Sequence, residues 1–285
     1  MNIRYRQVLG TIRLIHVFPT AVVVVTSLFL ILIVHGGNPG RGFMLRAGSV
    51  VLLSQIAVGA LNDYVDRELD AQLQPDKPIP SALVSPALAL GLVIVSLILI
   101  VPAGLTFGTG AFAVAAIGTF AGLAYDLWLK PTPLSFLGYI GGFLSLLTWV
   151  WLVAGHFSLW LVPLYPAAVL LLVAAHLAQS LPDIETDRTV GLHGLAVVLG
   201  PARSVRIIEM FYLVAALGGL GVAALARSVS AFGLVVLSMG VLAFARRLEP
   251  ERPHSRARRV RFFHAIAAGI ALQGLGSLLA ITSLG

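Results

Sequence analysis

The chain alternates long apolar runs with short polar connections. A helix needs about 20 predominantly apolar residues to cross the hydrocarbon core of a bilayer. The pattern therefore predicts an all-α, polytopic membrane protein with about nine transmembrane helices. The predicted spans are approximately residues 13–34, 43–61, 86–104, 109–125, 134–154, 159–180, 207–226, 229–246 and 262–283.

Composition supports this fold class and excludes several functions. Hydrophobic residues make up 58% of the chain and charged residues 11%, whereas soluble domains carry roughly 25% charged residues. The chain has no cysteine, which excludes disulfides, thiolate chemistry and Cys-ligated metals. Arg4, Arg6 and Arg13 precede a long apolar run, which we interpret as a retained first helix rather than a signal peptide.

The distribution of basic residues predicts the orientation in the membrane. The formal net charge is +7, but Lys and Arg in a membrane protein typically mark cytoplasmic loops, so no nucleic-acid partner is expected. With the N-terminus inside and the C-terminus outside, only Arg41, Arg46 and Arg227 of the nineteen basic residues lie on the outer side. The Arg-rich inner segment 246–261 is expected to contact anionic lipid headgroups.

Two clusters of acidic residues end apolar runs on the predicted inner side. The first comprises Asp63, Asp66 and Asp70 together with Asn62, and the second contains Asp183 and Asp187. On a helix, Asn62, Asp66 and Asp70 follow one another at intervals of four residues, and so do Asp183 and Asp187, so each set lies on one face. We interpret the two clusters as halves of one cytoplasm-facing site.

The chemistry of these clusters favours a hard cation. Neighbouring carboxylates beside hydrocarbon repel one another unless a cation lies between them. Oxygen-rich ligand sets suit Mg²⁺, which commonly binds one or two carboxylates together with phosphate oxygens. A solvated acidic loop would explain either cluster alone, but the recurrence of the cluster favours a metal-bridged diphosphate. Further residues placed to contact this ligand are Arg67, Lys77, Lys130 and Arg188, with His176 and Gln179 upstream of the second cluster.

Three motifs carry a resemblance to a known family. Asn62-Asp63-x-x-Asp66-x-x-x-Asp70 and Asp183-x-x-x-Asp187 resemble the paired aspartate motifs of the UbiA superfamily of intramembrane prenyltransferases. Tyr125-x-x-x-x-Lys130 resembles the Tyr/Lys motif of that family. The segments Arg13–Pro19 and Lys77–Ser81 also fit, so the likeness covers nearly the whole chain.

The resemblance implies a fold and a reaction. It implies a single domain, residues 1–285, of nine helices around a central cavity, with a cytoplasmic cap made by the loops at about 62–85 and 181–206. Members bind an isoprenyl diphosphate through Mg²⁺, ionise its allylic C–O bond and pass the carbocation to a lipophilic or aromatic acceptor. Carried over, Asp63, Asp66, Asp70, Asp183 and Asp187 hold the metal, Asn62 binds the diphosphate with them, and Tyr125 and Lys130 lie near the leaving group. The other expected substrate-binding residues, placed by their positions in the sequence, are Arg67, Lys77, Arg188, His176 and Gln179. Asp66, Asp187, Tyr125 and Lys130 are the expected catalytic residues.

Some positions depart from the family pattern and bear on the acceptor. Lys77-Pro78 stands where many members have Arg-Pro, Leu83 stands where an Arg is common, and Gln179 replaces a frequent Asn. The loss of a base at the mouth of the site disfavours a carboxylated aromatic acceptor. Candidate aromatic residues for stabilising the carbocation, which packing alone would also explain, are Phe120, Tyr139, Phe143 and Trp149.

Other functions compete with prenyl transfer. In a terpene cyclase of the same family, the carbocation would be captured by a double bond of its own chain, and the sequence does not separate this reaction from transfer. A cation-coupled transporter would also contain intramembrane acids, but the acids here lie at the inner face. The acceptor, the prenyl chain length and the oligomeric state are left open.

Overall fold

The protein is helical throughout its described part. The structure is a computed structural model that describes residues 3–157, 162, 164–248, 250–252 and 256–283, and no strand occurs in these ranges. Nine helices among the described residues are long and apolar enough to cross a bilayer. The predicted all-α membrane architecture is therefore confirmed. The chain divides into two compact units, Met1–Leu127 with Gly141–Phe157, and Trp128–Ile140 with Ser158–Gly285.

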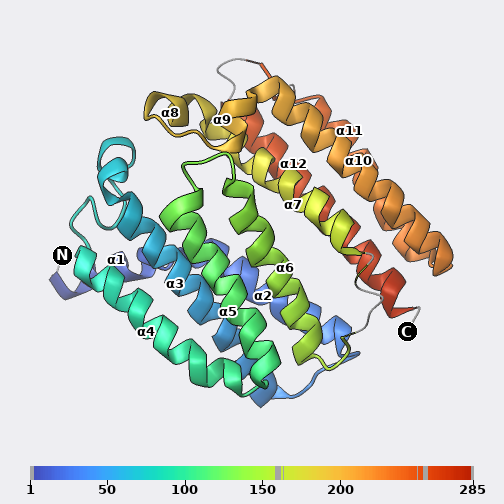
Figure 1. The fold of residues 1–285 in the computed structure, drawn as a ribbon, viewed down its shortest axis with the longest axis horizontal. Helices are drawn as coiled ribbons and strands as arrows, with labels where there is room; N and C mark the ends of the chain where they lie inside the picture. The colour runs from blue at the N-terminus through green and yellow to red at the C-terminus, as the bar shows by residue number, and fades with distance from the viewer. Residues whose placement is uncertain (1–2, 158–161, 163, 249, 253–255, 284–285) are drawn as a thin grey trace. The chain divides into compact units, whose positions relative to one another are not determined.

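Helix α3 (Arg41–Leu73) is the helix on which the first unit is built. Small buried residues on α3, including Ala47, Ala57 and Ala60, allow neighbouring helices to approach closely. At one such contact, a Cβ added to Gly122 would lie 2.7 Å from Cγ2 of Val58. The helices that pack against α3 (Figure 1) are α1 (Ile3–Leu14), α2 (Val17–Val34), α4 (Pro86–Leu105) and α5 (Thr109–Ala124).

The first aspartate cluster lies on helical backbone rather than in a loop. With 33 residues, α3 is longer than the predicted span 43–61 and exceeds the roughly 20 residues that cross a bilayer. The helix ends at Leu73, two residues before Pro75, whose ring disfavours helical geometry in the residue before it. The first part of the predicted loop at 62–85 is thus a helical extension, and only residues 74–85 form the connection to α4.

The predicted first span 13–34 is divided into two helices. Helix α1 ends at Leu14 and α2 begins at Val17. Between them, His16 has φ 48° and ψ 56°, the left-handed conformation that interrupts a right-handed helix. The sequence pattern showed only a continuous apolar run, so this break was not predicted.

The second unit is a group of long helices joined by short helical turns. Its long helices are α7 (Leu164–Ser180), α10 (Pro201–Leu225), α11 (Val229–Arg246) and α12 (Arg256–Thr282). Their core includes Leu177, Ile208, Phe262 and Ile266, all fully buried. The 3-10 helix η3 (Leu181–Asp183), α8 (Ile184–Thr189) and α9 (Leu195–Leu199) connect α7 to α10 and carry the second aspartate cluster. Part of the predicted span 159–180, residues 159–161 and 163, lies outside the described residues.

Two further elements contain residues of both units. These are the π-helical turn η1 (Tyr125–Leu129) and helix α6 (Ser135–Val153), which follows it. One boundary between the two units falls inside η1, and another falls inside α6. A π-helical turn lengthens the backbone hydrogen-bond spacing and is frequent at functional sites. Here it carries Tyr125 of the predicted Tyr/Lys motif.

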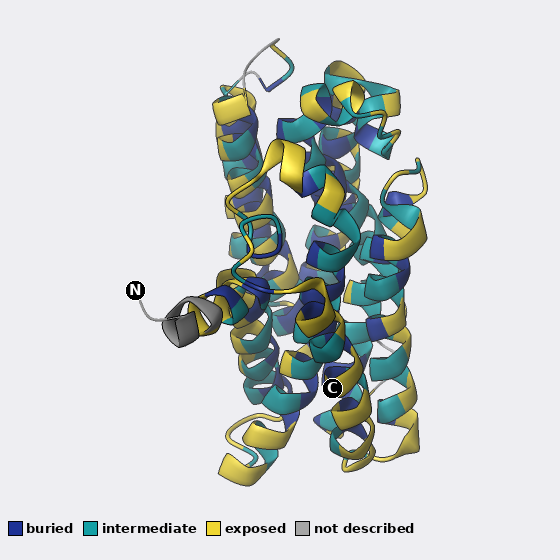
Figure 2. Ribbon diagram, turned by 90° about the vertical axis from the view of Figure 1, so that its left-hand side faces the viewer, coloured by how far each residue is buried: buried dark blue, intermediate teal, exposed yellow. Residues whose placement is uncertain are grey.

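Many large apolar side chains are exposed on the helices. Burial alternates along each helix, with buried positions in stripes and exposed positions on other faces (Figure 2). Exposed apolar residues include Val25, Ile98, Leu217 and Phe244. Extensive apolar surface marks contact with another apolar phase, so these faces are expected to contact lipid tails.

The contact between α10 and α12 gives a test of the packing. Tyr212 is fully buried and donates a hydrogen bond to the carbonyl oxygen of Ser238 at 3.0 Å. A Cβ added to Gly269 would lie 1.8 Å from the hydroxyl oxygen of Tyr212. We expect Gly269→Ala to reduce the free energy of unfolding by about 1–3 kcal/mol through overpacking, measured by thermal unfolding in detergent.

Gly274→Ala on the same helix is the matched control, because no atom lies within 4 Å of its added Cβ. Because alanine has a higher helix propensity than glycine, Gly274→Ala should leave the free energy of unfolding unchanged or slightly raised. Tyr212→Phe removes the clashing oxygen and should restore part of the stability lost in Gly269→Ala. Equal stability of the two alanine variants would contradict the packing described.

Candidate active site

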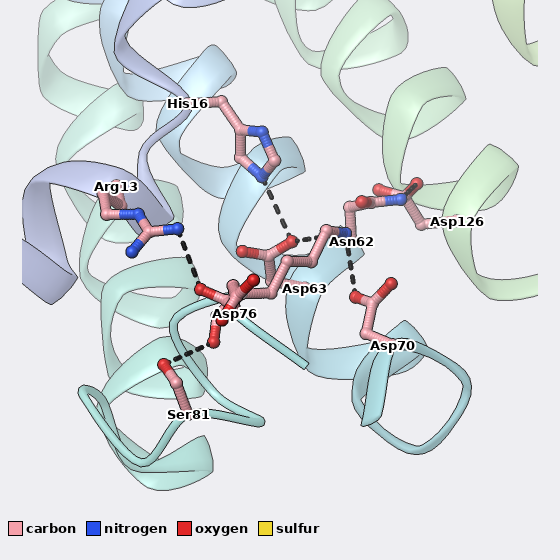
Figure 3. Close-up of polar contacts among 9 residues, drawn as sticks. Arg13, His16, Asn62, Asp63, Asp70, Asp76, Ser81 and Asp126 are labelled. Atoms are coloured by element: carbon pink, nitrogen blue, oxygen red, sulfur yellow. Dashed lines mark hydrogen bonds and ion pairs between the residues drawn. The ribbon is translucent and has the colours of Figure 1, made fainter. Parts of the chain in front are cut away.

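The first aspartate cluster lies on the last turns of α3 and faces a lysine from the following turn. Nζ of Lys77 lies 2.8 Å from Oδ2 of Asp70 and 3.1 Å from Oδ1 of Asp63. Asp63 and Asp70 are buried, with exposed fractions of 1% and 3%. Figure 3 shows the carboxylates of Asp63 and Asp70 on the last turns of α3. One ammonium group therefore bridges two buried carboxylates that are seven residues apart.

The backbone of the 74–85 turn holds Lys77 in this position. The backbone N–H groups of Leu83 and Val84 both donate to the carbonyl oxygen of Pro78, at 3.0 and 3.1 Å. Pro78, Ile79 and Val84 are buried, and Ile79 and Val84 pack in the same apolar cluster as Leu61 of α3. Burial of apolar side chains thus folds the turn back onto α3.

The environment of Lys77 keeps its amine charged. Burial by itself lowers the pKa of Lys77, but the hydrogen bond to Asp70 and the negative charges of Asp63 and Asp70 outweigh burial. The pKa of Lys77 is therefore raised above its ordinary value. At neutral pH the residue is a fixed cation beside the predicted ligand site.

Two other side chains approach the first cluster. Nε2 of His16 lies 3.2 Å from Oδ1 of Asp63. The amide nitrogen of Asn62 donates to Oδ1 of Asp126 in η1 at 3.0 Å. Asp126 was not among the predicted site residues. The available signal was its position inside the Tyr125–Lys130 motif at the end of an apolar run.

Arg67 and Asp66 differ in their surroundings from Asp63 and Asp70. The guanidinium of Arg67 donates to the carbonyl oxygen of Tyr64 at 2.7 Å, pairs with Glu68 at 3.1 Å and lies 4.8 Å from the centre of the Tyr64 ring. Arg67 therefore turns back along its own helix. Asp66 is partly exposed, whereas Asp63 and Asp70 are buried.

The second aspartate cluster begins where α7 ends. Asp183 closes η3 and Asp187 lies in α8. Lys130 lies close enough to Asp187 to interact with it electrostatically, as does Asp183. The described structure thus brings Lys130, Asp183 and Asp187 together within the second unit.

Arginines from the start of α12 hold the second cluster. Nη2 of Arg256 lies 3.1 Å from Oδ1 of Asp183. Arg259 is fully buried, forms an ion pair with Glu185 and donates to the carbonyl oxygen of Leu181 at 3.2 Å. The sequence predicted headgroup contacts for this Arg-rich segment, so its pairing with the acidic cluster was missed. Opposite charges far apart in sequence give no local signal of such a pairing.

The remaining predicted residues occupy different environments. His176 is buried, with Nε2 2.9 Å from Oγ of Ser135 and its ring 5.5 Å from that of Tyr139. Gln179 and Arg188 are exposed. Of the candidate aromatic residues, Trp149 is buried, whereas Phe120 and Phe143 are exposed.

The donor set of the first cluster fits a divalent cation. Oδ2 of Asp63 is buried and has no hydrogen-bond partner among the described residues, so it is available as a ligand atom. The set contains only oxygen donors, as Mg²⁺ prefers. Within the described ranges, no three His, Cys, Asp or Glu side chains converge in a complete metal-binding group. Additional ligands would have to come from a substrate or from water.

Comparison with known proteins identifies the family. The sequence matches the UbiA prenyltransferase family over residues 23–267. It is 32% identical over 187 residues to the digeranylgeranylglyceryl phosphate synthase of Natronomonas pharaonis, covering 65% of this chain and 67% of the relative. It is 31% identical over 178 residues to the bacteriochlorophyll synthase 33 kDa chain of Cereibacter sphaeroides, covering 57% of each.

Solved structures share the fold. A structure of digeranylgeranylglyceryl phosphate synthase in membranes aligns with a TM-score of 0.70 at 16% identity, covering 97% of this chain and 99% of the other. A UbiA homolog from Archaeoglobus fulgidus bound to GPP and Mg²⁺ aligns with a TM-score of 0.70 at 16% identity, covering 93% and 99%. Because the family match spans most of the sequence, the predicted family is confirmed: this integral membrane protein is a prenyltransferase that belongs to the UbiA family.

Proposed function

We propose that the protein transfers a prenyl group from an isoprenyl diphosphate to a lipophilic or aromatic acceptor within the membrane, in a Mg²⁺-dependent reaction. The observation that carries the proposal is the charge of the first cluster. Asp63 and Asp70 share one ammonium, that of Lys77, and Asp66 lies on the same stretch of α3. With the carboxylates ionised, this set has a net negative charge that a divalent cation would neutralise. The Archaeoglobus fulgidus homolog bound to GPP and Mg²⁺ supports the choice of ligand.

We assign roles to both clusters. Asp63, Asp66 and Asp70 of the first cluster and Asp183 and Asp187 of the second would hold the metal of the metal-diphosphate group. Mg²⁺, when bound, would supply positive charge to the diphosphate oxygens as the leaving group departs. Lys77 and Lys130 bring fixed positive charge to the same oxygens.

Further residues complete this proposed diphosphate site. Asn62 and Tyr125 would contact the diphosphate or its leaving oxygen, and Arg67 and Arg188 would cover its remaining anionic oxygens. His176 and Gln179 line the path from the second cluster into the membrane. Together they orient the substrate so that its prenyl chain extends among the apolar helices.

The reaction breaks one bond and forms another. The allylic C–O bond breaks, and the electron pair leaves with pyrophosphate. A nucleophilic carbon or oxygen of the acceptor then bonds to the allylic carbon and loses its proton. The surrounding apolar helices exclude water that would otherwise capture the carbocation, and the aromatic face of Tyr139 would attract its charge.

The site is proposed to face the cytoplasm, with the N-terminus inside and the C-terminus outside. The positions of Lys and Arg support this orientation. In this arrangement residues 62–85 and 181–206 cover the cytoplasmic mouth of a central cavity in one functional domain, residues 1–285.

Neutralising a metal ligand should abolish turnover without unfolding the protein. We expect Asp66→Asn and Asp187→Asn to lower kcat by at least about 100-fold, because removing the charge that holds the metal removes stabilisation of the leaving group. Pyrophosphate release from a prenyl diphosphate measures this loss. Folded yield by size-exclusion chromatography should change little.

Glu68→Gln provides the matched control for Asp66→Asn. Glu68 is on the same helix and loses the same charge, but its side chain is 84% exposed and pairs with Arg67. Its activity should stay close to that of the unmodified protein. Retained turnover in Asp66→Asn or Asp187→Asn would contradict the role of the corresponding cluster.

Product analysis tests transfer itself. Geranylgeranyl and farnesyl diphosphate would be supplied with acceptors of three kinds: a phenol, a carboxylated phenol and a glyceryl phosphate lipid. The glyceryl phosphate lipid is included because curated relatives are digeranylgeranylglyceryl phosphate synthases. Pyrophosphate release that requires an acceptor, with a prenylated product, is the expected result. A cyclic hydrocarbon or alcohol formed without acceptor would contradict transfer.

The pH dependence of stability tests the state of Lys77. Because its folded pKa is raised, the stabilisation from its ion pairs is complete below the unfolded value and is lost as pH rises through the folded value. The difference in melting temperature between the unmodified protein and Lys77→Gln should therefore be constant from about pH 6 to pH 9 and shrink only above about pH 10.4. Loss of that difference by pH 8 would contradict a buried, charged lysine.

A further inference from the structure

His16 occupies a backbone conformation that its side chain does not favour. Its φ of 48° and ψ of 56° lie in the left-handed region, which non-glycine residues adopt at an energetic cost. Such strain is kept where surrounding contacts or function require it. The conformation ends α1, starts α2 and turns the imidazole toward α3.

The surface of α3 accommodates this imidazole. Nε2 of His16 lies 3.2 Å from Oδ1 of Asp63, as Figure 3 shows. Gly59, one turn earlier on α3, lies beneath the ring, since a Cβ added there would be 3.1 Å from Cδ2 of His16. The absence of a side chain at Gly59 therefore lets the ring reach Asp63.

The helix before His16 also contacts the turn that carries Lys77. Nη2 of Arg13 donates to the backbone carbonyl oxygen of Asp76 at 2.8 Å. A Cβ added to Gly10 would lie 2.7 Å from Cγ2 of Val84 and 2.8 Å from Cβ of Leu83. Helix α1 thus packs closely on the Lys77 turn while His16 contacts α3.

These contacts constrain both sides of the first cluster. His16 and Lys77 both bind Oδ1 of Asp63. Oδ2 of the same carboxylate is buried and has no hydrogen-bond partner in the described part of the chain. Two contacts to one oxygen fix the carboxylate plane and hence the direction of the other oxygen.

We propose that His16 is a positioning residue that orients Asp63 so that its second carboxylate oxygen binds the metal of the metal-diphosphate complex. The inference rests on the proposed function. It makes α1 a structural support of the site, acting through His16 on Asp63 and through Arg13 on the Lys77 turn.

The test separates the hydrogen bond from the backbone strain. His16→Gly removes the imidazole and relieves the left-handed strain, whereas His16→Asn tolerates that conformation and retains an amide donor. Mn²⁺ binding would be measured by electron paramagnetic resonance in the presence of farnesyl diphosphate. We expect His16→Gly to bind Mn²⁺ about 10–100-fold more weakly, as is typical when a residue that orients a ligand is lost. Its melting temperature should be unchanged or raised, and His16→Asn should recover much of the affinity.

Arg227→Gly is the matched control. Arg227 is also left-handed, with φ 49°, and lies in the connection between α10 and α11 in the other unit. The substitution should leave Mn²⁺ affinity unchanged. In an Asp63→Asn background, His16→Gly should cause no additional loss of Mn²⁺ affinity, because His16 acts through Asp63 and that residue has already been altered.

Three outcomes would overturn the inference. The first is a Mn²⁺ affinity of His16→Gly that lies within twofold of that of the unmodified protein. The second is that the losses of Mn²⁺ affinity caused by His16→Gly and Asp63→Asn add fully in the double variant. The third is that His16→Asn binds Mn²⁺ as weakly as His16→Gly does. If His16→Gly does not fold, His16→Asp tests the same point, because its carboxylate repels Asp63 while tolerating the left-handed backbone. Unchanged affinity in that variant would equally refute the role of His16. Failure of the unmodified protein to bind Mn²⁺ and a prenyl diphosphate would instead refute the proposed function.

Discussion

The first unit depends on how buried negative charge is balanced at the end of a membrane helix. Asp63 and Asp70 are withdrawn from water, and an ionised carboxylate without a partner is strongly unfavourable there. The ammonium of Lys77 lies within 3.1 Å of both residues and provides that partner. Because Lys77 comes from the following turn, residues 74–85 must fold back onto α3. This requirement accounts for the extension of α3, the buried Pro78 and Ile79, and the docking of α1.

The second unit balances its acidic residues by a different route. Its basic partners, Arg256 and Arg259, come from the start of α12, more than 70 positions along the chain. The buried guanidinium of Arg259 also binds backbone carbonyl oxygens of Leu181 and Pro250, so it fixes the turn on which the acidic residues lie. The acidic motifs resemble each other, but the contacts that hold them do not. Substitutions in α12 are therefore expected to affect the second cluster selectively.

The sequence predicted the helices and the motifs well because both depend on local patterns. Apolar runs of membrane-spanning length gave nine spans, and the spacing of Asp63, Asp66 and Asp70 placed them on one helix. Features that depend on tertiary contacts were not predicted. The break at His16 lies inside a continuous apolar run, and Asn62 meets Asp126 across 64 positions. Arg256 was interpreted as a headgroup contact because no local pattern shows that it pairs with Asp183.

The central claim of the proposed function is that the two aspartate clusters bind the same metal-diphosphate group. Because the chain contains no cysteine, spin labels can be attached at chosen sites without altering the native sequence elsewhere. Glu68→Cys and Thr189→Cys would place labels beside the two clusters at exposed positions that have no assigned role in binding. Double electron–electron resonance would then measure the distance between them. The account predicts a single narrow distribution when Mg²⁺ and a non-hydrolysable prenyl diphosphate are both present, and a broader one when either is omitted. A distribution that is unaffected by the two ligands together would contradict it.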